Sequence, residues 1–234
     1  MISVVIPAYN EAESLHPLTL ELIDVMHGTG QEFEILLIDD GSRDGTREVM
    51  RQLANEFPEI HFIGFTRNRG QTTALAAGFK KARGDIIVTL DADMQNDPRD
   101  IPRLIRMLDR HDVVCGWRRE RRDDLVRRIS SRVANYVRNK LSGEDSADVG
   151  CSLKVYKREC VEELKLFDGM HRFLPTLVKL AGYTVVEVPV AHRPRQWGTS
   201  KYNIRNRILR AFVDLLAVRW MKKRYIWYEI EEER

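Results

Sequence analysis

The chain has 234 residues, enough for one large domain with its own core, and its 43% hydrophobic and 31% charged residues are ordinary for a soluble globular protein. The net charge of +3 conceals two basic segments: 118–140 holds nine Lys or Arg residues and three acidic ones, and 193–224 holds ten and one. Such segments indicate an anionic partner. No apolar run approaches the roughly 18 residues of a transmembrane helix, and residues 1–14 lack the features of a signal peptide, so we expect no membrane-spanning segment in this chain.

Short apolar runs alternate with helical patterns through the first half of the chain. Strands are predicted at 2–7, 34–39, 60–65, 85–91 and 112–116. Helices are predicted at 13–26, within 41–57, at 71–82 and near 102–110. This β-α alternation predicts an α/β fold, with a mainly parallel, doubly wound sheet and helices on both of its faces.

The rhythm changes after residue 116. Apolar residues are spaced for one helix face within 125–141, and further strands are predicted at 150–156 and 184–190. Residues 201–225 predict a long amphipathic helix with an apolar face of Ile204, Ile208, Phe212, Leu215, Leu216 and Trp220. We therefore expect a catalytic or binding domain over 1–200, followed by an amphipathic helix and tail over 201–234.

The three cysteines are Cys115, Cys151 and Cys160. An odd number without tight spacing argues against a disulfide framework and against a zinc site. We expect reduced thiols, as is typical of a cytoplasmic protein.

Polar residues follow the predicted strands at 7–11, 39–42, 66–70 and 91–95. In doubly wound sheets, ligands bind beyond the carboxyl ends of the strands, so these segments predict one ligand cleft, in which we expect Asp39 and Asp40 to lie beside the acidic end of the fourth strand. The absence of a GxGxxG pattern after the first strand argues against a dinucleotide site, and the absence of GxxxxGK[ST] excludes a P-loop.

The segment LDADMQNDP (90–98) is the most informative of these. Asp91 and Asp93 are two residues apart, so both carboxylates can approach one Mg²⁺ or Mn²⁺ ion, with the Gln95 amide oxygen as a further ligand. An EF-hand is excluded because Asn96 and Pro102 stand where Gly and Glu are needed. An aspartyl nucleophile and a polar loop whose acids cap the next helix remain open at this point.

Seven segments, in order, resemble one known family. IPAYNEAESL, LLIDDGSRDGT, RNRGQTTALAAGF and LDADMQNDP resemble the nucleotide-sugar domain of family 2 glycosyltransferases with the GT-A fold. GWRRERRDD, DVGCSLKVYKRE and HRPRQWGTSKY resemble the polyprenyl-phosphate glycosyltransferases, which include dolichyl-phosphate mannose synthase. The resemblance covers roughly residues 2–224, and it departs from many relatives because no transmembrane helices follow.

The resemblance implies roles for individual residues. For the nucleotide sugar it implies binding by Pro7, Tyr9, Glu11, Asp39, Asp40 and Asp91. It implies that Asp91, Asp93 and Gln95 hold Mg²⁺ or Mn²⁺ on the diphosphate. It places Arg118, after the fifth strand, toward a phosphate, and it implies an acceptor-phosphate role for Arg193, Ser200 and Lys201. The RNRGQ segment favours a UDP-sugar over a GDP-sugar.

The implied reaction is an inverting transfer from a nucleoside diphosphate sugar to a polyprenyl phosphate, with Asp93, Arg118 and Asp148 as the catalytic candidates. A lipid monophosphate has a second pKa of about 6, so it is ionised near pH 7 and needs no strong base. A hydroxyl acceptor would need one, for which Asp148 is the candidate, although Asp148 equally suits a capping role. The rivals are a hydroxyl-acceptor enzyme of the same fold, a non-catalytic nucleotide-sugar-binding module, and an aspartyl phosphatase, against which Gln95 counts.

The basic helices predict an anionic membrane surface as a partner, because a basic helix with an apolar opposite face can lie in a membrane interface. We therefore expect a peripheral protein on the cytoplasmic face of the membrane. Packing of these helices on the body, or on a second copy in a homo-oligomer, is the alternative. Nucleic acid is not expected, because no RNP-like aromatic motif occurs.

Overall fold

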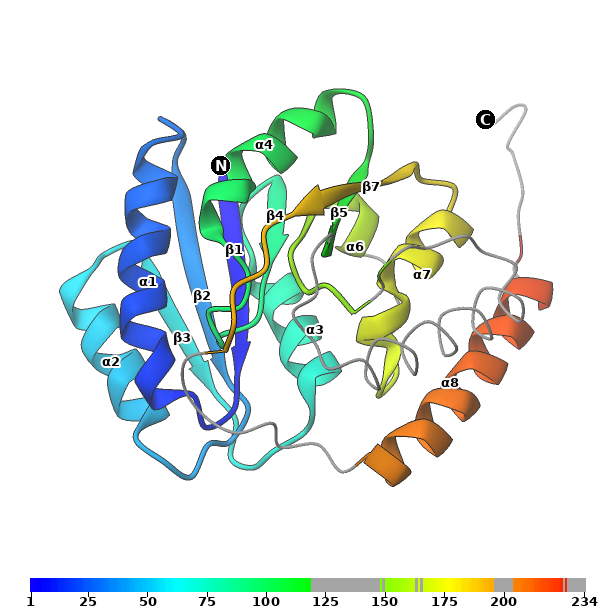
Figure 1. Cartoon of the computed structure of the whole chain (residues 1–234), viewed down its shortest axis with the longest axis horizontal. Helices are drawn as coiled ribbons and strands as arrows, with labels where there is room; N and C mark the ends of the chain where they lie inside the picture. Colours follow the sequence, from blue (N-terminus) through cyan, green and yellow to red (C-terminus); the bar gives the residue numbers. More distant parts are fainter. Residues whose placement is uncertain are drawn as a thin grey trace, which may run out of the picture.

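The computed structural model describes residues 1–118, 148, 150–162, 164, 166–195, 204–224 and 226, with side chains from residue 213 onward in the last helix. Seven strands form one sheet with helices on both faces (Figure 1). The strands are β1 (Ile2–Ala8), β2 (Phe33–Asp39), β3 (Ile60–Gly64), β4 (Ile86–Thr89), β5 (Val113–Arg118), β6 (Lys154–Lys157) and β7 (Val185–Val190). Their order across the sheet is β3-β2-β1-β4-β6-β5-β7, and only β6 runs antiparallel to its neighbours within it. The mainly parallel, doubly wound α/β sheet is confirmed.

Helices connect the strands on both faces of the sheet. They are α1 (Ala12–His27), α2 (Thr46–Glu56), α3 (Gln71–Lys81), α4 (Ile101–Arg106), α6 (Glu159–Glu162), α7 (Leu174–Leu180) and α8 (Ile204–Arg224), with 3-10 turns η1 (Pro98–Asp100), η2 (Met107–Asp109) and η3 (Met170–Phe173). One core lies between the sheet and α1, α2 and α4; the other lies between the sheet and α3, α6 and α7.

The strands of the parallel part are almost continuously apolar because both of their faces are buried. In β1, Ile2, Val4 and Ile6 belong to the first core, whereas Val5 belongs to the second. Gly78 of α3 lies against Val5 so closely that a Cβ there would be 2.2 Å from a Val5 methyl carbon. The helix therefore packs directly onto the sheet. This packing fixes the position of its first residue, Gln71, which donates a hydrogen bond to Asp91.

Three details differ from the sequence prediction. Asp39 and Asp40 were expected beside the acidic end of β4, but β1 lies between β2 and β4 in the sheet. Arg118 was expected after the fifth strand, but it is the last residue of β5 because pairing with β7 continues as far as Val190. The expected helix near 102–110 is shorter, because α4 gives way to a 3-10 turn at Met107. The helix expected within 125–141 lies outside the described residues.

Helix α8 has two apolar sides rather than the single face predicted for it. Leu215 and Val218 are buried against η3 and α7, beside which α8 lies (Figure 1). Val213, Leu216 and Trp220 are spaced three and four residues apart and are 57%, 45% and 63% exposed. Leu216 and Trp220 were therefore wrongly grouped with Leu215. No helix in the described part of the chain is both long and apolar enough to cross a membrane.

Gly41, just after β2, offers a test of how the sheet edge is built. Its φ is +70°, and a Cβ there would lie 2.3 Å from the Arg67 carbonyl carbon. We expect Gly41→Ala to lower the free energy of unfolding by about 2–4 kcal/mol, measured by urea denaturation. Gly30→Ala is the matched control, since Gly30 has a φ of +67° with no atom within 4 Å, and should cost about 1 kcal/mol. Equal losses would show that the contact with residue 67 is unimportant.

Candidate functional site

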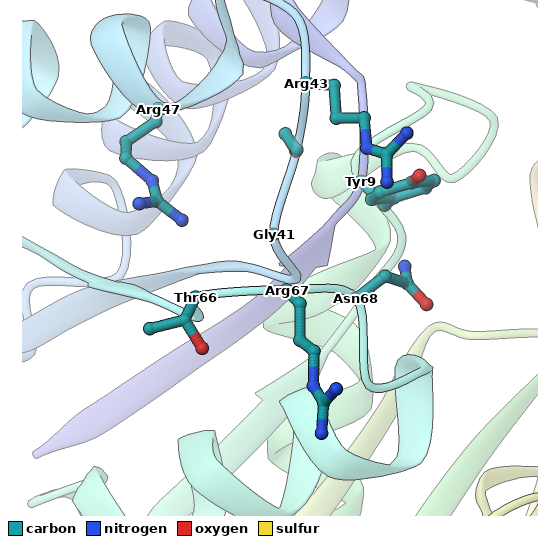
Figure 2. A pocket seen from close by; sticks show the side chains of 8 residues that line it. Tyr9, Gly41, Arg43, Arg47, Thr66, Arg67 and Asn68 are labelled. Carbon is teal, nitrogen blue, oxygen red and sulfur yellow. The ribbon is translucent and has the colours of Figure 1, made fainter.

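A cleft of ≈ 190 Å³ opens beyond the carboxyl ends of β1, β2 and β3, where the sequence predicted a ligand. Its lining residues are Tyr9, Gly41, Ser42, Arg43, Arg47, Thr66, Arg67 and Asn68 (Figure 2). Figure 2 shows the Arg43 guanidinium beside the Tyr9 ring, whereas the Arg67 side chain extends away from these two residues. Arg43 and Arg67 have no ion-pair partner in the part of the chain that the structure describes. The cleft is therefore an electropositive pocket with one aromatic wall.

Asp39 shapes this cleft from below. It is fully buried; its Oδ1 accepts a hydrogen bond from the Ser42 N–H at 2.8 Å, and its Oδ2 accepts one from Arg47 Nε at 2.6 Å. Arg47 also donates to the carbonyl oxygen of Phe65, beyond β3. Asp39 thus ties together the chain segments after β2 and β3. Its contact with a base or ribose stays a prediction.

Asp40 fixes the opposite wall. Its carboxylate accepts hydrogen bonds from Asn68 Nδ2 at 2.9 Å and from the N–H groups of Arg69 and Gly70 at 2.6 and 2.9 Å. Burial raises the pKa of Asp40, the two N–H groups act in the opposite direction, and the neighbouring charge of Asp39 raises it further. The adjacent aspartates therefore serve two different loops. Both are better described as anchors of the cleft than as free carboxylates.

Three of the four other residues expected at the donor site, Pro7, Tyr9 and Glu11, lie near β1 and its end, and the fourth, Asp91, lies after β4. Pro7 is within β1, paired with Ile38 of β2 and absent from the cleft lining. Tyr9 lines the cleft. Glu11 precedes α1, and its N–H donates to Thr46 Oγ1 at 2.9 Å, so the start of α1 is tied to the start of α2.

The acidic turn lies on the other side of β1, after β4. Met94 has a φ of +58°, so the chain turns sharply there. Asp91 Oδ1 accepts a hydrogen bond from Gln71 Nε2 at 2.8 Å. Asp93 Oδ1 accepts one from the Gln95 N–H at 3.1 Å, and its Oδ2 accepts one from Arg195 Nη2 at 2.7 Å. The three predicted metal ligands thus lie within one five-residue turn, in which the Asp91 and Asp93 carboxylates are close enough to interact electrostatically.

The carboxylates of the turn repel each other, and positively charged groups lie beside them. Burial, with the charge of Asp93 added, raises the pKa of Asp91 from 3.8 to about 6, against the opposing effects of Ser152, Lys154 and Arg118. The Arg195 guanidinium forms ion pairs with Asp93 at 2.7 Å and with Glu11 at 3.7 Å, and its positive charge offsets the repulsion between the carboxylates. The described residues contain no group of three or more His, Cys, Asp or Glu side chains suited to a metal. Two carboxylates and an amide nevertheless suit Mg²⁺ or Mn²⁺, because these ions commonly take further ligands from substrate phosphates.

Arg118, at the end of β5, forms a bidentate ion pair with Asp148. Its Nε and Nη2 donate to the two carboxylate oxygens of Asp148 at 2.7 and 2.9 Å, and the Gly150 N–H donates to the same carboxylate at 3.2 Å. Such a pair fixes the orientation of the guanidinium. Asp148 is buried with both oxygens engaged, so its contacts are those of a positioning residue for Arg118. Its use as a general base stays a prediction.

Arg193 is occupied by structural contacts. Its guanidinium donates to Glu21 at 2.6 and 2.8 Å and lies 2.7 Å from Asp97, and the hydrogen bonds to Glu21 raise its pKa above the usual value. Its predicted contact with an acceptor phosphate is untested, and Ser200 and Lys201 lie outside the described residues. The sequence reasoning missed Gln71 and Arg195. Arg195 is two positions beyond Arg193 in the same motif, which was the available signal.

Comparison with known proteins assigns the class: the chain belongs to glycosyl transferase family 2, whose model matches residues 3–165. It is 39% identical over 223 residues to a dodecaprenyl-phosphate galacturonate synthase of Rhizobium johnstonii, covering 93% of this chain and 66% of the relative. It is 41% identical over 220 residues to an undecaprenyl-phosphate 4-deoxy-4-formamido-L-arabinose transferase of Photorhabdus laumondii, covering 92% and 67%. The chain thus spans about two thirds of the length of these curated relatives.

Solved structures identify the fold. A mannosyltransferase of Pyrobaculum calidifontis, in complex with GDP-Man and Mn²⁺, has a TM-score of 0.65 at 24% identity, over 92% of this chain and 63% of that one. Glucosyl-3-phosphoglycerate synthase of Mycobacterium tuberculosis, in complex with Mn²⁺ and UDP-glucose, has a TM-score of 0.69 at 19% identity, over 94% and 78%. The GT-A fold expected from the sequence, and the family resemblance, are confirmed.

The raised pKa of Asp91 predicts a pH-dependent stability. The folded protein holds this proton more tightly than the unfolded chain, so the contribution of Asp91 to the free energy of unfolding falls as the pH rises from 3.8 to about 6. Asp91→Asn should therefore be more stable than the wild type by about 1–3 kcal/mol above pH 7, and nearly equal to it near pH 4. Urea denaturation in EDTA across this range tests the prediction. Asp109→Asn, at an exposed position, is the control and should change stability by less than about 0.5 kcal/mol at every pH.

Proposed function

We propose that the chain is a metal-dependent, inverting glycosyltransferase that moves a sugar from a nucleoside diphosphate sugar to a polyprenyl phosphate at a membrane surface. The observation that carries the proposal is the acidic turn of Asp91 and Asp93, adjoined along one sheet edge by an electropositive cleft and by the fixed cation Arg118. The two curated relatives are named for transfer involving a polyprenyl phosphate, which supports the acceptor. We assign the catalytic domain to 1–200 and membrane attachment to 201–234.

The order of the strands suggests how the donor lies along the sheet edge, from its nucleoside to its diphosphate. The cleft over β1–β3 suits the nucleoside, with the Tyr9 ring available for stacking, and the acidic turn beyond β1 suits the diphosphate. Arg43 and Arg67 offer only hydrogen-bond donors, which match the two carbonyl oxygens of uracil better than guanine, whose edge also presents donors. Asp91, Asp93 and Gln95 would hold Mg²⁺ or Mn²⁺, which as a Lewis acid neutralises the charge of the departing diphosphate.

Arg118 is the cation that we assign to the acceptor phosphate. Because Asp148 binds it through two hydrogen bonds, its guanidinium is positioned before any acceptor arrives. A phosphate monoester is already ionised near neutral pH, so an acceptor of this kind needs a cation and no base. With both oxygens of Asp148 engaged, this arrangement fits a lipid phosphate better than a hydroxyl acceptor.

Helix α8 is the element that we assign to membrane attachment. Its outer stripe of Val213, Leu216 and Trp220 is followed by the exposed basic residues Lys222, Lys223 and Arg224. An apolar stripe beside basic residues suits an anionic interface, where each basic residue near the surface contributes about 1 kcal/mol.

A transfer assay tests the proposed reaction. Purified protein is mixed with liposomes containing undecaprenyl phosphate and a panel of radiolabelled UDP- and GDP-sugars, with Mn²⁺ or with EDTA. We expect label in the lipid fraction with a UDP-sugar, loss of labelling in EDTA, and a decrease of at least about 100-fold for Asp93→Asn. Donor hydrolysis without lipid labelling would instead indicate a hydroxyl acceptor, and no turnover of any donor would contradict the enzymatic function.

Liposome co-sedimentation tests the role of α8. The double variant Leu216→Gln/Trp220→Gln should weaken binding to anionic liposomes about tenfold or more, because it removes the apolar contact while leaving the charges in place. Its melting temperature should be unchanged. Val218→Gln is the matched variant on the inner side, and it should lower the melting temperature because Val218 is fully buried. Unchanged liposome binding of the double variant would remove α8 from the membrane interface.

A further inference from the structure

We propose that Arg195 is an internal counter-cation of the donor site: it neutralises Asp93 in the free protein and releases it when a divalent metal and a nucleoside diphosphate bind. This inference rests on the proposed metal-dependent function and adds a residue to it. The Arg195–Asp93 ion pair would make the metal and the donor bind cooperatively, because both must displace or replace it.

The backbone after β7 carries Arg195 onto the acidic turn. Asn96 and His192 form an antiparallel bridge, and the Arg193 N–H donates to the Gln95 carbonyl oxygen at 2.8 Å. The Ala191 N–H donates to Asp100 Oδ2 at 2.8 Å. Residues 191–195 thus lie along the loop that contains Asp93, and they are held there at several points.

The two arginines of this segment do different work. The Arg193 guanidinium pairs with Glu21 on α1 and with Asp97, neither of which is a predicted metal ligand, and so it anchors the segment. Arg195 reaches Asp93 at 2.7 Å and Glu11 at 3.7 Å. Of these two arginines, Arg195 is therefore the one whose guanidinium pairs with a predicted metal ligand.

Arg195 and a metal ion would compete electrostatically for the Asp93 carboxylate. One oxygen of this carboxylate accepts the Gln95 N–H and the other accepts Arg195. A metal ion at its usual distance of about 2.0–2.1 Å from a carboxylate oxygen would repel a guanidinium bonded to the same group. At Asp91 the hydrogen-bonding side chains are the neutral Gln71 and Ser152, and the cations Lys154 and Arg118 act on it only electrostatically.

Release of Arg195 is easier when a diphosphate is present. In the free protein, a guanidinium leaving Asp93 keeps Glu11 as its only other described carboxylate contact. A diphosphate offers it anionic oxygens, so part of the lost ion pair is replaced. By linkage, the nucleotide then raises the affinity for the metal, and the metal raises the affinity for the nucleotide by the same factor.

The test measures Mn²⁺ binding directly, by electron paramagnetic resonance of free Mn²⁺, with and without UDP. In the absence of UDP, Arg195→Gln should bind Mn²⁺ about tenfold more tightly than the wild type, and Arg195→Lys should stay within about threefold of it. Arg99→Gln is the matched control: Arg99 is an exposed arginine on the same loop, paired with Glu21 and Asp97, and should change the affinity less than about twofold. Addition of UDP should increase the Mn²⁺ affinity of the wild type by a larger factor than that of Arg195→Gln.

The outcomes separate this role from the proposed function. Mn²⁺ binding by both proteins with equal affinity, or weaker binding by Arg195→Gln, overturns the role of Arg195 and leaves the metal-dependent enzyme intact. No Mn²⁺ binding by either protein, with or without UDP, overturns both. Unchanged melting temperatures of the variants exclude misfolding as the reason for a negative result.

Discussion

Two carboxylates at the end of a buried strand repel each other, and much of the structure around the acidic turn compensates for this repulsion. Asp91 receives a hydrogen bond from the first residue of α3, Asp93 receives one from Arg195, and Arg118 and the buried Lys154 add positive charge nearby. These groups come from α3, β5, β6 and the segment after β7, which are far apart in the sequence. The turn is therefore held by residues from both the N-terminal and the C-terminal half of the sequence.

The cleft beside the turn depends on a second pair of acids used in a different way. Asp39 and Asp40 are consecutive, yet Asp39 binds Arg47 and Asp40 binds the loop that precedes α3. Their carboxylates face the loops that line the cleft, and these loops in turn present Tyr9, Arg43 and Arg67. The buried carboxylates thus hold loops whose arginines line the cleft, and a positively charged lining suits an anionic nucleotide.

The fold and the position of the site could be predicted from the sequence because both follow from local patterns. Apolar runs such as 34–39 mark buried strands, and polar residues directly after them mark the ligand edge. The partners of the site residues could not be predicted in this way. Nothing local to Asp148 indicates its pairing with Arg118, and nothing local to Arg193 indicates Glu21, because these contacts depend on how α1, β5 and the segment after β7 pack together. Helix α8 shows the same limit, since periodicity identified apolar residues but not which of two sides each one faces.

The two apolar sides of α8 have a consequence for the behaviour of the protein in solution. The inner side is already covered by η3 and α7, so a lipid surface and a second copy of the chain would compete for the same outer stripe of Val213, Leu216 and Trp220. Self-association through this stripe grows with protein concentration, whereas binding to lipid grows with the available membrane area. Self-association through α8 would therefore be favoured in concentrated, lipid-free solution, and an excess of membrane surface would shift the chain from the oligomer to the lipid-bound monomer.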